Sequence, residues 1–251
     1  MDKIIIAGCK GFVGREISKL FPEAEGYDLG MEYIRVSRPK YDVCFICVPT
    51  PMNEDGSCDI TAVENVIKSI GAKVYIIRST IPPETTEKLG DNCVFTPEYV
   101  ASSSPYPAPL GDIKARTFHI IGGKPEYTKR VRKLLEKKYP PTCEFMECSA
   151  LTAEIIKYME NSFIANYVTF CNEFYEICQK FGADYDEVRR GFLLDPRMTK
   201  WWTYVYTEKR GWGGHCLGKD CSAIIKACEN KGYEPKFLKA IVENNKRHRG
   251  E

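Results

Sequence analysis

The sequence predicts an α/β fold in which a doubly wound parallel sheet comes first and an all-α domain follows. Two observations carry this prediction. Short β-rich runs alternate with helical stretches as far as Cys148, which is typical of a parallel sheet with helices on both faces. From Ser149 onward only helical patterns occur. Because 251 residues suffice for two domains that each bury a core, we expect domains at 1–148 and 149–251.

The expected elements of the first domain follow from β-branched runs and from amphipathic periodicity. Seven strands are predicted, at 3–7, 26–28, 43–48, 74–77, 93–95, 118–121 and 143–146. Four helices are predicted between them, at 12–21, 61–70, 84–89 and 126–138, with Asp59 as a cap for the second. A Ser- and Pro-rich stretch at 100–115 would lie at the carboxyl ends of the strands, where ligands bind in such folds.

The second domain is predicted to begin with a long helix at 152–181, whose apolar residues occupy most of its circumference. Such a helix is buried on several sides, as at the centre of a domain or at a subunit interface, so we expect a homodimer. Shorter helices are expected at 220–230 and 237–245.

Composition and charge exclude several classes of partner. The 36 basic and 34 acidic residues give a formal charge of +2, with no nucleic-acid or membrane footprint. The N-terminus runs directly into a strand without an apolar leader, so we expect a cytoplasmic protein. The twelve cysteines occur singly within apolar runs and are expected to be reduced. Cys44 and Cys47 have CxxC spacing, but their apolar surroundings favour a buried strand over a redox or metal site.

A glycine-rich turn between the first strand and the first helix predicts a dinucleotide site of the Rossmann type. Its N–H groups and the helix dipole can face a pyrophosphate, and its residues are Gly8, Gly11, Phe12, Val13 and Gly14. The spacing is GxxGxxG, one residue longer than GxGxxG. Asp28 ends the second predicted strand, where a carboxylate would bind the adenosine ribose and repel a 2′-phosphate. We therefore expect NAD in preference to NADP.

The segment 211–220 contains four glycines and presents Cys216 beside Lys219 and Asp220. Gly213 and Gly214 are expected to leave room for a bulky ligand. With a helix predicted at 220–230, Cys216 would lie just ahead of a helix N-terminus, whose partial positive charge favours a thiolate nucleophile. The alternative is a glycine turn with a packed thiol.

Three polar residues share one face of the long predicted helix. Glu154, Lys157 and Asn161 are spaced i, i+3 and i+7 in an otherwise apolar segment. Glu154 and Lys157 could form a plain salt bridge. Lys157 and Asn161 could instead hold a substrate hydroxyl and stabilise the oxyanion that forms while a hydride leaves its carbon.

Together with these features, six motifs resemble the UDP-glucose/GDP-mannose dehydrogenase family over essentially the whole chain. The motifs occur in the family's order and lie at 48–51 with Asp59, at 79–86, at 97–99, at 152–161, at 172–173 and at 213–220. The resemblance implies a four-electron oxidation that consumes two NAD. A primary alcohol of a nucleotide sugar becomes an aldehyde, is trapped by the cysteine as a thiohemiacetal, is oxidised to a thioester and is hydrolysed to the uronate. The implied pathway is surface or capsular polysaccharide synthesis.

The resemblance also implies roles for individual residues. Cys216 would be the nucleophile, and Lys157 and Asn161 would stabilise the oxyanion. Asp220 would be the carboxylate that supports the water, lysine or hydrolysis step. Thr80 and Glu98 would lie near the nicotinamide and the sugar. Further cofactor contacts are expected at Val48, Pro49, Thr50, Ser79 and Thr80, and substrate contacts at Tyr99, Lys157, Asn161, Gly213, Gly214 and Lys219.

Two departures and two alternatives accompany the resemblance. A family glutamate implicated in thioester hydrolysis corresponds here to Ser102 or a neighbouring small residue. The sequence also ends before the family's second Rossmann-like domain, so we expect either a smaller sugar substrate or a partner chain docked on the helix at 237–245, through Leu238, Ile241 and Val242.

Two alternative functions stay open at this point. One is a two-electron β-hydroxyacid-type dehydrogenase without a cysteine step, and the other is an inactive NAD-binding module completed by a partner chain.

Overall fold

The computed structural model describes residues 2–31, 40–99 and 112–251, and the chain divides into two compact units. The first unit comprises Met1–Asn53 and Cys58–Lys157, and the second comprises Glu54–Ser57 and Tyr158–Glu251. This division assigns the first two turns of the long helix to the sheet unit. The predicted domain boundary at 148 stays a prediction. Ser102 and most of the Ser- and Pro-rich stretch lie outside the described residues.

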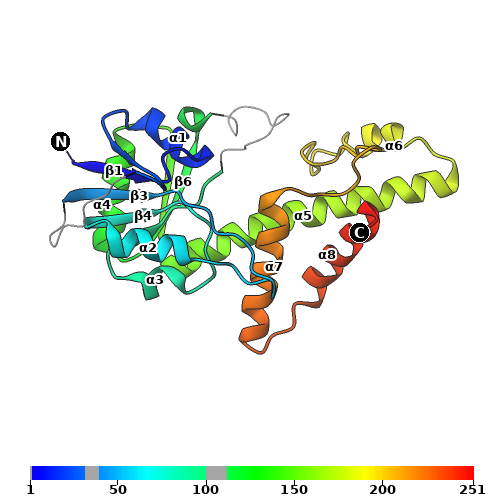
Figure 1. The fold of residues 1–251 in the computed structure, drawn as a ribbon. Coiled ribbons are helices and arrows are strands. Elements are labelled where there is room, and N and C mark those ends of the chain that lie inside the picture. Colours follow the sequence, from blue (N-terminus) through cyan, green and yellow to red (C-terminus); the bar gives the residue numbers. More distant parts are fainter. Residues whose placement is uncertain (1, 32–39, 100–111) are drawn as a thin grey trace. The chain divides into compact units, whose positions relative to one another are not determined.

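The first unit is built on a seven-stranded sheet with the order β2-β1-β3-β4-β5-β6-β7 (Figure 1). The strands are β1 Ile4–Ala7, β2 Glu25–Tyr27, β3 Tyr41–Ile46, β4 Ala72–Ile77, β5 Cys93–Phe95, β6 Phe118–Gly122 and β7 Glu144–Cys148. Neighbours pair in parallel except β5 and β6, which are antiparallel. The seven predicted strands and the α/β class are thus confirmed, with strand ends shifted by at most two residues.

The prediction of a parallel sheet was wrong for one pair of strands, β5 and β6. Apolar runs in the sequence do not encode strand direction. Direction depends on the connection, and a parallel neighbour needs a crossover, usually a helix. The described part of the connection from β5 to β6 contains only the short 3-10 helix Ile113–Ala115. β6 and β7 are joined by the helix α4, Pro125–Glu136, and are parallel to each other.

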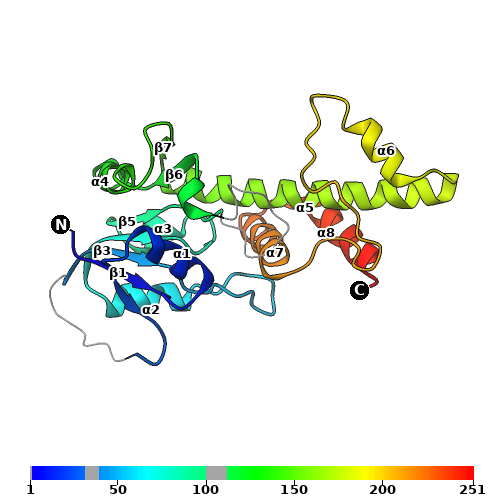
Figure 2. The same ribbon diagram turned by 90° about the horizontal axis from the view of Figure 1, so that it is seen from above.

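Two apolar layers cover the sheet, because alternate residues of each strand point to opposite faces. Ile4 and Ile6 belong to the cluster that includes α1, Phe12–Leu20, and α4. Ile5 and Ala7 belong to the cluster that includes α2, Thr61–Ser69, and the start of the long helix. A strand buried on both faces is apolar throughout, which explains the continuous runs in the sequence. Figure 2 shows these helices on the sheet from a second side, together with α3, Thr85–Leu89.

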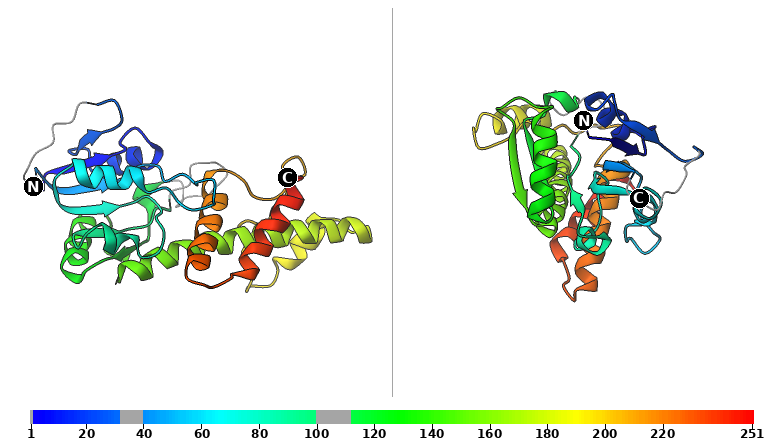
Figure 3. Two further views of the ribbon diagram at one scale, coloured as in Figure 1. Left: turned by 60° about the horizontal axis from the view of Figure 1, so that its bottom comes forward. Right: turned by 90° about the vertical axis from the view of Figure 1, so that its left-hand side faces the viewer.

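The second unit contains helices only. They are α5 Ala150–Phe181, which begins in the first unit, α6 Tyr185–Phe192, α7 His215–Asn230 and α8 Lys236–Arg249. Ala165, Trp212, Cys221 and Ile241 form a core that joins α5, α7 and α8, and the left view of Figure 3 shows α7 (orange) and α8 (red) crossing α5 (light green). α6 was not predicted, because its eight residues are largely charged. α7 begins five residues earlier than predicted, so Cys216 lies inside the helix.

The apolar surface of α5 is less buried than predicted. Met159 is 73% exposed and Phe163 57% exposed, and the same helix leaves several other large apolar side chains partly exposed: Leu151, Ile155, Phe170, Phe174, Ile177 and Phe181. Other residues of the helix do pack on neighbours, among them Tyr158, Ala165 and Cys171. Within one chain, α5 therefore does not bury its whole circumference.

The apolar stripe of α8 was expected to be free for a partner chain, but it packs within the chain, and the partner chain itself stays a prediction. Ile241 is buried, and Leu238 and Val242 pack partly buried against the core that contains Ala165 and Trp212. The chain itself covers these side chains.

The cysteines match the expectation of reduced, mostly buried thiols. All twelve are free, and both Cys44 and Cys47 are buried at the end of β3. Burial raises the pKa of Cys47 to about 12, which makes it a poor metal ligand or redox thiol. Among the described residues no cluster of potential metal ligands occurs, and no helix is both long and apolar enough to cross a bilayer.

Candidate active site

The glycine turn brings three backbone segments into close contact. Gly8 has φ +82°, and a Cβ on it would lie 2.5 Å from the Cys47 carbonyl oxygen. A Cβ on Gly14 would overlap the Gly8 carbonyl and lie 2.8 Å from Cys9 Cα. The helix bonds of α1 begin with Arg15 N–H to Gly11 O, at 3.0 Å, so the preceding N–H groups are free of helical partners. This cradle, which only glycine can form, fits a dinucleotide pyrophosphate despite its longer spacing.

Asp28 follows β2 directly and is tied to the glycine turn. Its Oδ2 accepts a hydrogen bond from Lys10 N–H at 2.7 Å, and its Oδ1 accepts one from Leu29 N–H at 2.8 Å. Each carboxylate oxygen has a second lone pair for a ribose hydroxyl. The structure therefore brings the predicted acid to the predicted turn. Of the other two predicted turn residues, Val13 packs against the sheet core and Phe12 begins α1.

The loops after β3 and β4 are joined at the carboxyl edge of the sheet. Thr50 Oγ1 donates to the Thr80 carbonyl at 2.8 Å, and Ser79 Oγ donates to the Val48 carbonyl at 2.5 Å. Thr50 and Ser79 are buried, so these hydroxyls fix the loops. The structure brings together four of the residues expected to contact the cofactor, with Pro49 between Val48 and Thr50.

Glu154 serves the sheet unit as an anchor for α3. Its carboxylate accepts hydrogen bonds from Glu84 N–H at 2.7 Å, from Thr86 N–H at 2.8 Å and from Thr86 Oγ1 at 2.6 Å. Burial raises the pKa of Glu154, although these three donors oppose the shift. The bond to Glu84 also supports a left-handed residue, with φ 69°. The carboxylate is thus committed to α3.

Glu98 lies in a buried ion-pair cluster. Its two oxygens pair with the guanidinium groups of Arg78 and Arg116, and Oε1 also accepts Tyr99 N–H at 2.7 Å. Burial alone would raise the pKa of Glu98, but the two arginines outweigh it and hold the pKa well below its usual range. A carboxylate held in this way is a weak base, so the geometry favours a positioning role for Glu98 over direct chemistry.

Lys157 is seated on an aromatic ring. Its Nζ lies 4.7 Å from the centroid of the Tyr99 ring, and the Arg116 guanidinium lies 5.4 Å from the same centroid. The Tyr99 ring also packs on Phe118 at 4.9 Å. Lys157 is buried, and the negative face of a ring favours an ammonium there. The Pro-Glu-Tyr segment therefore connects the ion-pair cluster to the ammonium.

Cys216 is the second residue of α7 and is exposed, whereas the other eleven cysteines are buried or partly buried. Asp220 lies one turn further along α7 and is buried. Its Oδ2 accepts a hydrogen bond from Asn161 Nδ2 of α5 at 2.6 Å, and its Oδ1 pairs with Lys219 Nζ at 2.5 Å. Asn161, Lys219 and Asp220 therefore form one bonded group, a turn away from the thiol.

The glycines ahead of Cys216 differ in what surrounds them. A Cβ on Gly213 would lie 2.7 Å from Arg249 Nη1, so the room expected there for a ligand is filled by α8. Gly214 has φ +82°, and among the described residues no atom lies within 4 Å of such a Cβ. Of these two glycines, Gly214 is the one that faces open space.

Arg78 and Arg116 were not predicted, although one signal was present. Arg78 closes the apolar run of β4, and a charge in a buried strand needs a buried partner. Arg116 precedes β6 and gave no comparable signal. The contacts of α8 with the segment at 210–213 could not be foreseen, because they join helices that are distant in the sequence.

Two regions match one protein family. Residues 23–106 match the description "UDP-glucose/GDP-mannose dehydrogenase family, NAD binding domain", and residues 151–247 match "UDP-glucose/GDP-mannose dehydrogenase family, central domain". The UDP-glucose 6-dehydrogenase AglM of Haloferax volcanii is 29% identical over 233 residues, which cover 81% of this chain and 52% of that protein. The UDP-glucose 6-dehydrogenase of Rickettsia prowazekii is 30% identical over 224 residues, which cover 82% of this chain and 49% of that protein.

A solved structure shares the fold. The UDP-glucose dehydrogenase of Pyrobaculum islandicum aligns with a TM-score of 0.83 at 22% identity, over 98% of this chain and 68% of that chain. At this identity the likeness shows the fold alone. The chain spans about half the length of the curated relatives it matches.

Proposed function

Because this chain belongs to the UDP-glucose/GDP-mannose dehydrogenase family, we propose that it oxidises the primary alcohol of a nucleotide sugar to the carboxylate through a thioester on Cys216. The observation that carries the proposal is the exposed thiol of Cys216 in the first turn of α7, one turn from the buried Asp220–Asn161 pair. A lone exposed cysteine would be weak support, but here the helix that presents it is bonded to α5, which carries Lys157 one turn before Asn161.

The first oxidation converts the alcohol to an aldehyde. NAD, bound at the glycine turn and Asp28, supplies the hydride acceptor. The Lys157 ammonium and the Asn161 amide hold the substrate oxygen and stabilise the negative charge that develops on it when its proton leaves. The Tyr99 ring favours the charged form of Lys157 that this role requires.

The second half of the reaction is covalent. The Cys216 thiolate adds to the aldehyde carbon, a C–S bond forms, and the carbonyl electron pair moves to oxygen. The same carbon then loses its hydrogen as a hydride, for which a second NAD would be the acceptor, and the re-formed carbonyl is a thioester. Water forms a C–O bond to this carbon while the C–S bond breaks and the thiolate leaves. One alcohol, one water and two NAD give one carboxylate, two NADH and three protons. Asp220 orients the groups around the thiol through Asn161 and Lys219.

The exposed side chains of α5 support a homodimer as part of the proposal. Met159 and Phe163 belong to an apolar stripe along a 32-residue helix. A second copy of the chain would bury this stripe by a self-complementary contact.

The test measures how many NADH form for each acid. The chain is incubated with NAD and a panel of nucleotide sugars and simple hydroxyacids, and the products are identified by mass spectrometry. We expect two NADH per carboxylate with a nucleotide sugar. We expect Cys216→Ser to lose acid formation but keep NAD binding, whereas Cys228→Ser, further along α7, should behave as the parent.

The alternatives give different results. One NADH per product from a hydroxyacid, unaffected by Cys216→Ser, would favour a two-electron dehydrogenase. NAD binding without NADH formation from any substrate would favour a binding module.

A further inference from the structure

We propose that Asn245 of α8 and Asn172 of α5 are positioning residues for Cys216, because together they hold the backbone of the segment that leads into α7. This inference rests on the proposed function, since it concerns the nucleophile of that reaction. The segment comprises residues 210–214, and its last residue is the N-cap of α7. None of its own side chains caps the helix.

Asn245 binds both backbone polar groups of Trp212. Its Oδ1 accepts Trp212 N–H at 2.8 Å, and its Nδ2 donates to the Trp212 carbonyl at 2.9 Å. Asn245 is 3% exposed, so the two hydrogen bonds are shielded from water. A single amide thus fixes the peptide planes on both sides of Trp212. The indole is held as well, because its Nε1 donates to Thr169 Oγ1 at 2.8 Å.

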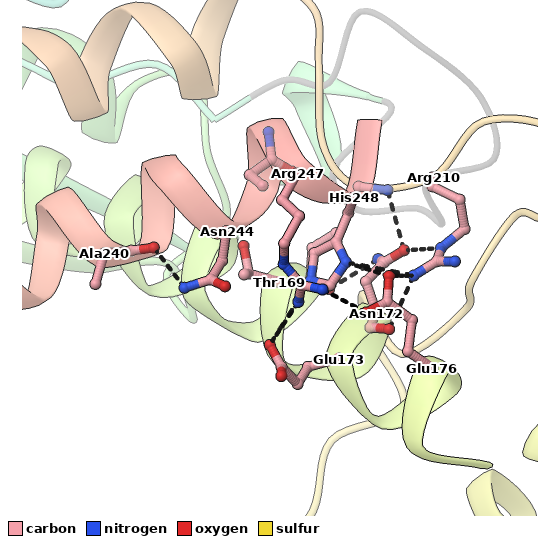
Figure 4. Close-up of polar contacts among 12 residues, drawn as sticks. Thr169, Asn172, Glu173, Glu176, Arg210, Ala240, Asn244, Arg247 and His248 are labelled. Atoms are coloured by element: carbon pink, nitrogen blue, oxygen red, sulfur yellow. Dashed lines mark hydrogen bonds and ion pairs between the residues drawn. The ribbon is translucent and has the colours of Figure 1, made fainter. Parts of the chain in front are cut away.

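Asn172 holds the preceding residues from α5. Its Oδ1 accepts Gly211 N–H at 3.0 Å and Arg210 Nε at 2.7 Å. Figure 4 shows Arg210 reaching over Asn172 toward Glu176, which also accepts the Arg210 Nη2 at 3.1 Å and lies 2.9 Å from His248 Nδ1. Asn172 is therefore fixed by Arg210, whose guanidinium is in turn paired with Glu176 of α5.

The glycines of the segment allow this close approach. A Cβ on Gly211 would overlap Asn245 Oδ1, and a Cβ on Gly213 would lie 3.2 Å from the Arg249 guanidinium carbon. The glycines therefore serve the docking of α8 onto the segment. Four residues after Trp212 comes the thiol, and four residues later Asp220 is bonded to Asn161. The turn that carries Cys216 is thus fixed on both sides.

Positioning matters here because covalent catalysis needs the sulfur at bonding distance and in line with the carbonyl. A displacement of about 1 Å can cost roughly 10²-fold in rate. Removal of Asn245 leaves Trp212 N–H and C=O without this partner, and the first turn of α7 loses its anchor on that side.

The test compares Asn245→Ala with Asn244→Ala. Asn244 is half-buried, and the bond described for its side chain goes to the Ala240 carbonyl of its own helix, at 2.9 Å, as Figure 4 shows. The first readout is alkylation of Cys216 by iodoacetamide, followed by mass spectrometry and needing no substrate. We expect Asn245→Ala to slow it by roughly two- to fivefold, because the thiol loses its fixed place at the helix N-terminus. The second readout is kcat and KM for acid formation from UDP-glucose. We expect kcat to fall about tenfold or more with KM unchanged within about twofold.

If Asn245 had only a structural role, its replacement would lower the melting temperature of the chain but would not lower kcat while leaving KM unchanged. Asn245→Asp keeps the acceptor for Trp212 N–H, so it should recover part of the lost alkylation rate and part of the lost kcat. If Asn245→Ala does not fold, Asn245→Asp is compared with Asn244→Ala instead. Unchanged alkylation in a folded Asn245 variant, or an equal loss in Asn244→Ala, would overturn the proposal. If the parent chain forms no NADH, the proposed function fails, and alkylation alone decides whether Asn245 positions the thiol.

Discussion

Replacing Glu98 by glutamine should destabilise the chain strongly, because it removes the negative charge that pairs with two buried arginines. The side chains of Arg78, Arg116 and Glu98 are 2%, 5% and 9% exposed. Breaking a buried ion pair by removing one partner costs about 3 to 5 kcal/mol. Arg78 keeps a hydrogen bond to Thr96 Oγ1, at 2.7 Å, but gains no new counter-charge. With a urea m-value of about 2 to 3 kcal/mol/M, the unfolding midpoint should fall by about 1 to 2 M.

The loss should depend on pH in a defined direction. The pKa of Glu98 is held well below its usual value of 4.5 in the folded chain, because the two arginines outweigh the effect of burial. A carboxyl group with a lowered pKa contributes stability that is fully present above 4.5 and is lost as the pH falls toward the folded pKa. The difference in free energy of unfolding between parent and Glu98→Gln should therefore be largest at neutral pH and should shrink below pH 4.5.

The assay is urea unfolding followed by far-UV circular dichroism at several pH values, with Glu64→Gln as the control. Glu64 pairs with Lys68 at 3.1 Å on the surface of α2, where the two side chains are 40% and 68% exposed. An exposed pair of this kind is worth about 0.5 kcal/mol or less. If Glu98→Gln costs no more than Glu64→Gln at neutral pH, or if its cost grows as the pH falls, the reasoning on the buried cluster is wrong.

Three further predictions concern the cofactor site and the subunit contact. Gly14→Ala should abolish NAD binding by calorimetry, because its Cβ would overlap the Gly8 carbonyl, whereas Gly191→Ala, which has open space, should bind as the parent does. Asp28→Ala should narrow the preference for NAD over NADP by about 1 to 3 kcal/mol. If the parent chain binds NAD and NADP with equal affinity, the assignment of Asp28 to the adenosine ribose is wrong. Phe163→Glu should shift a dimer toward monomer in sedimentation velocity, and an unchanged mass would argue against α5 as the contact.

The features that the sequence predicted well are those set by local chemistry. The strands were recognisable because residues such as Ile4 to Ala7 are apolar on both faces of the sheet. The glycine turn and Asp28 were recognisable because a tight turn before a helix and an acid after the next strand have few other uses. The structure brings them into contact through Lys10 N–H, and a shared NAD site stays a prediction.

The features that the sequence predicted poorly depend on contacts between distant segments. Glu98 stood in a motif and was assigned to chemistry, but its partners Arg78 and Arg116 are 20 and 18 residues away. Glu154 was weighed as a partner for Lys157, three residues away, but it bonds residues at 84 and 86. In both cases the sequence pointed to the polar residue but not to its partner. The partner was set by the packing of strands and helices, which the periodicity of a sequence does not reveal.

The glycine run before Cys216 shows why the same residue type supports opposite interpretations. A glycine indicates that something approaches the backbone closely, but it does not indicate what. Gly213 and Gly214 were predicted to leave room for a ligand, yet Arg249 of α8 occupies the place beside Gly213, as Asn245 occupies the place beside Gly211. Only Gly214, next to the helix that carries Cys216, keeps open space. If a sugar approaches the thiol past this segment, it must do so at Gly214, since the two preceding glycines are used to hold the segment in place.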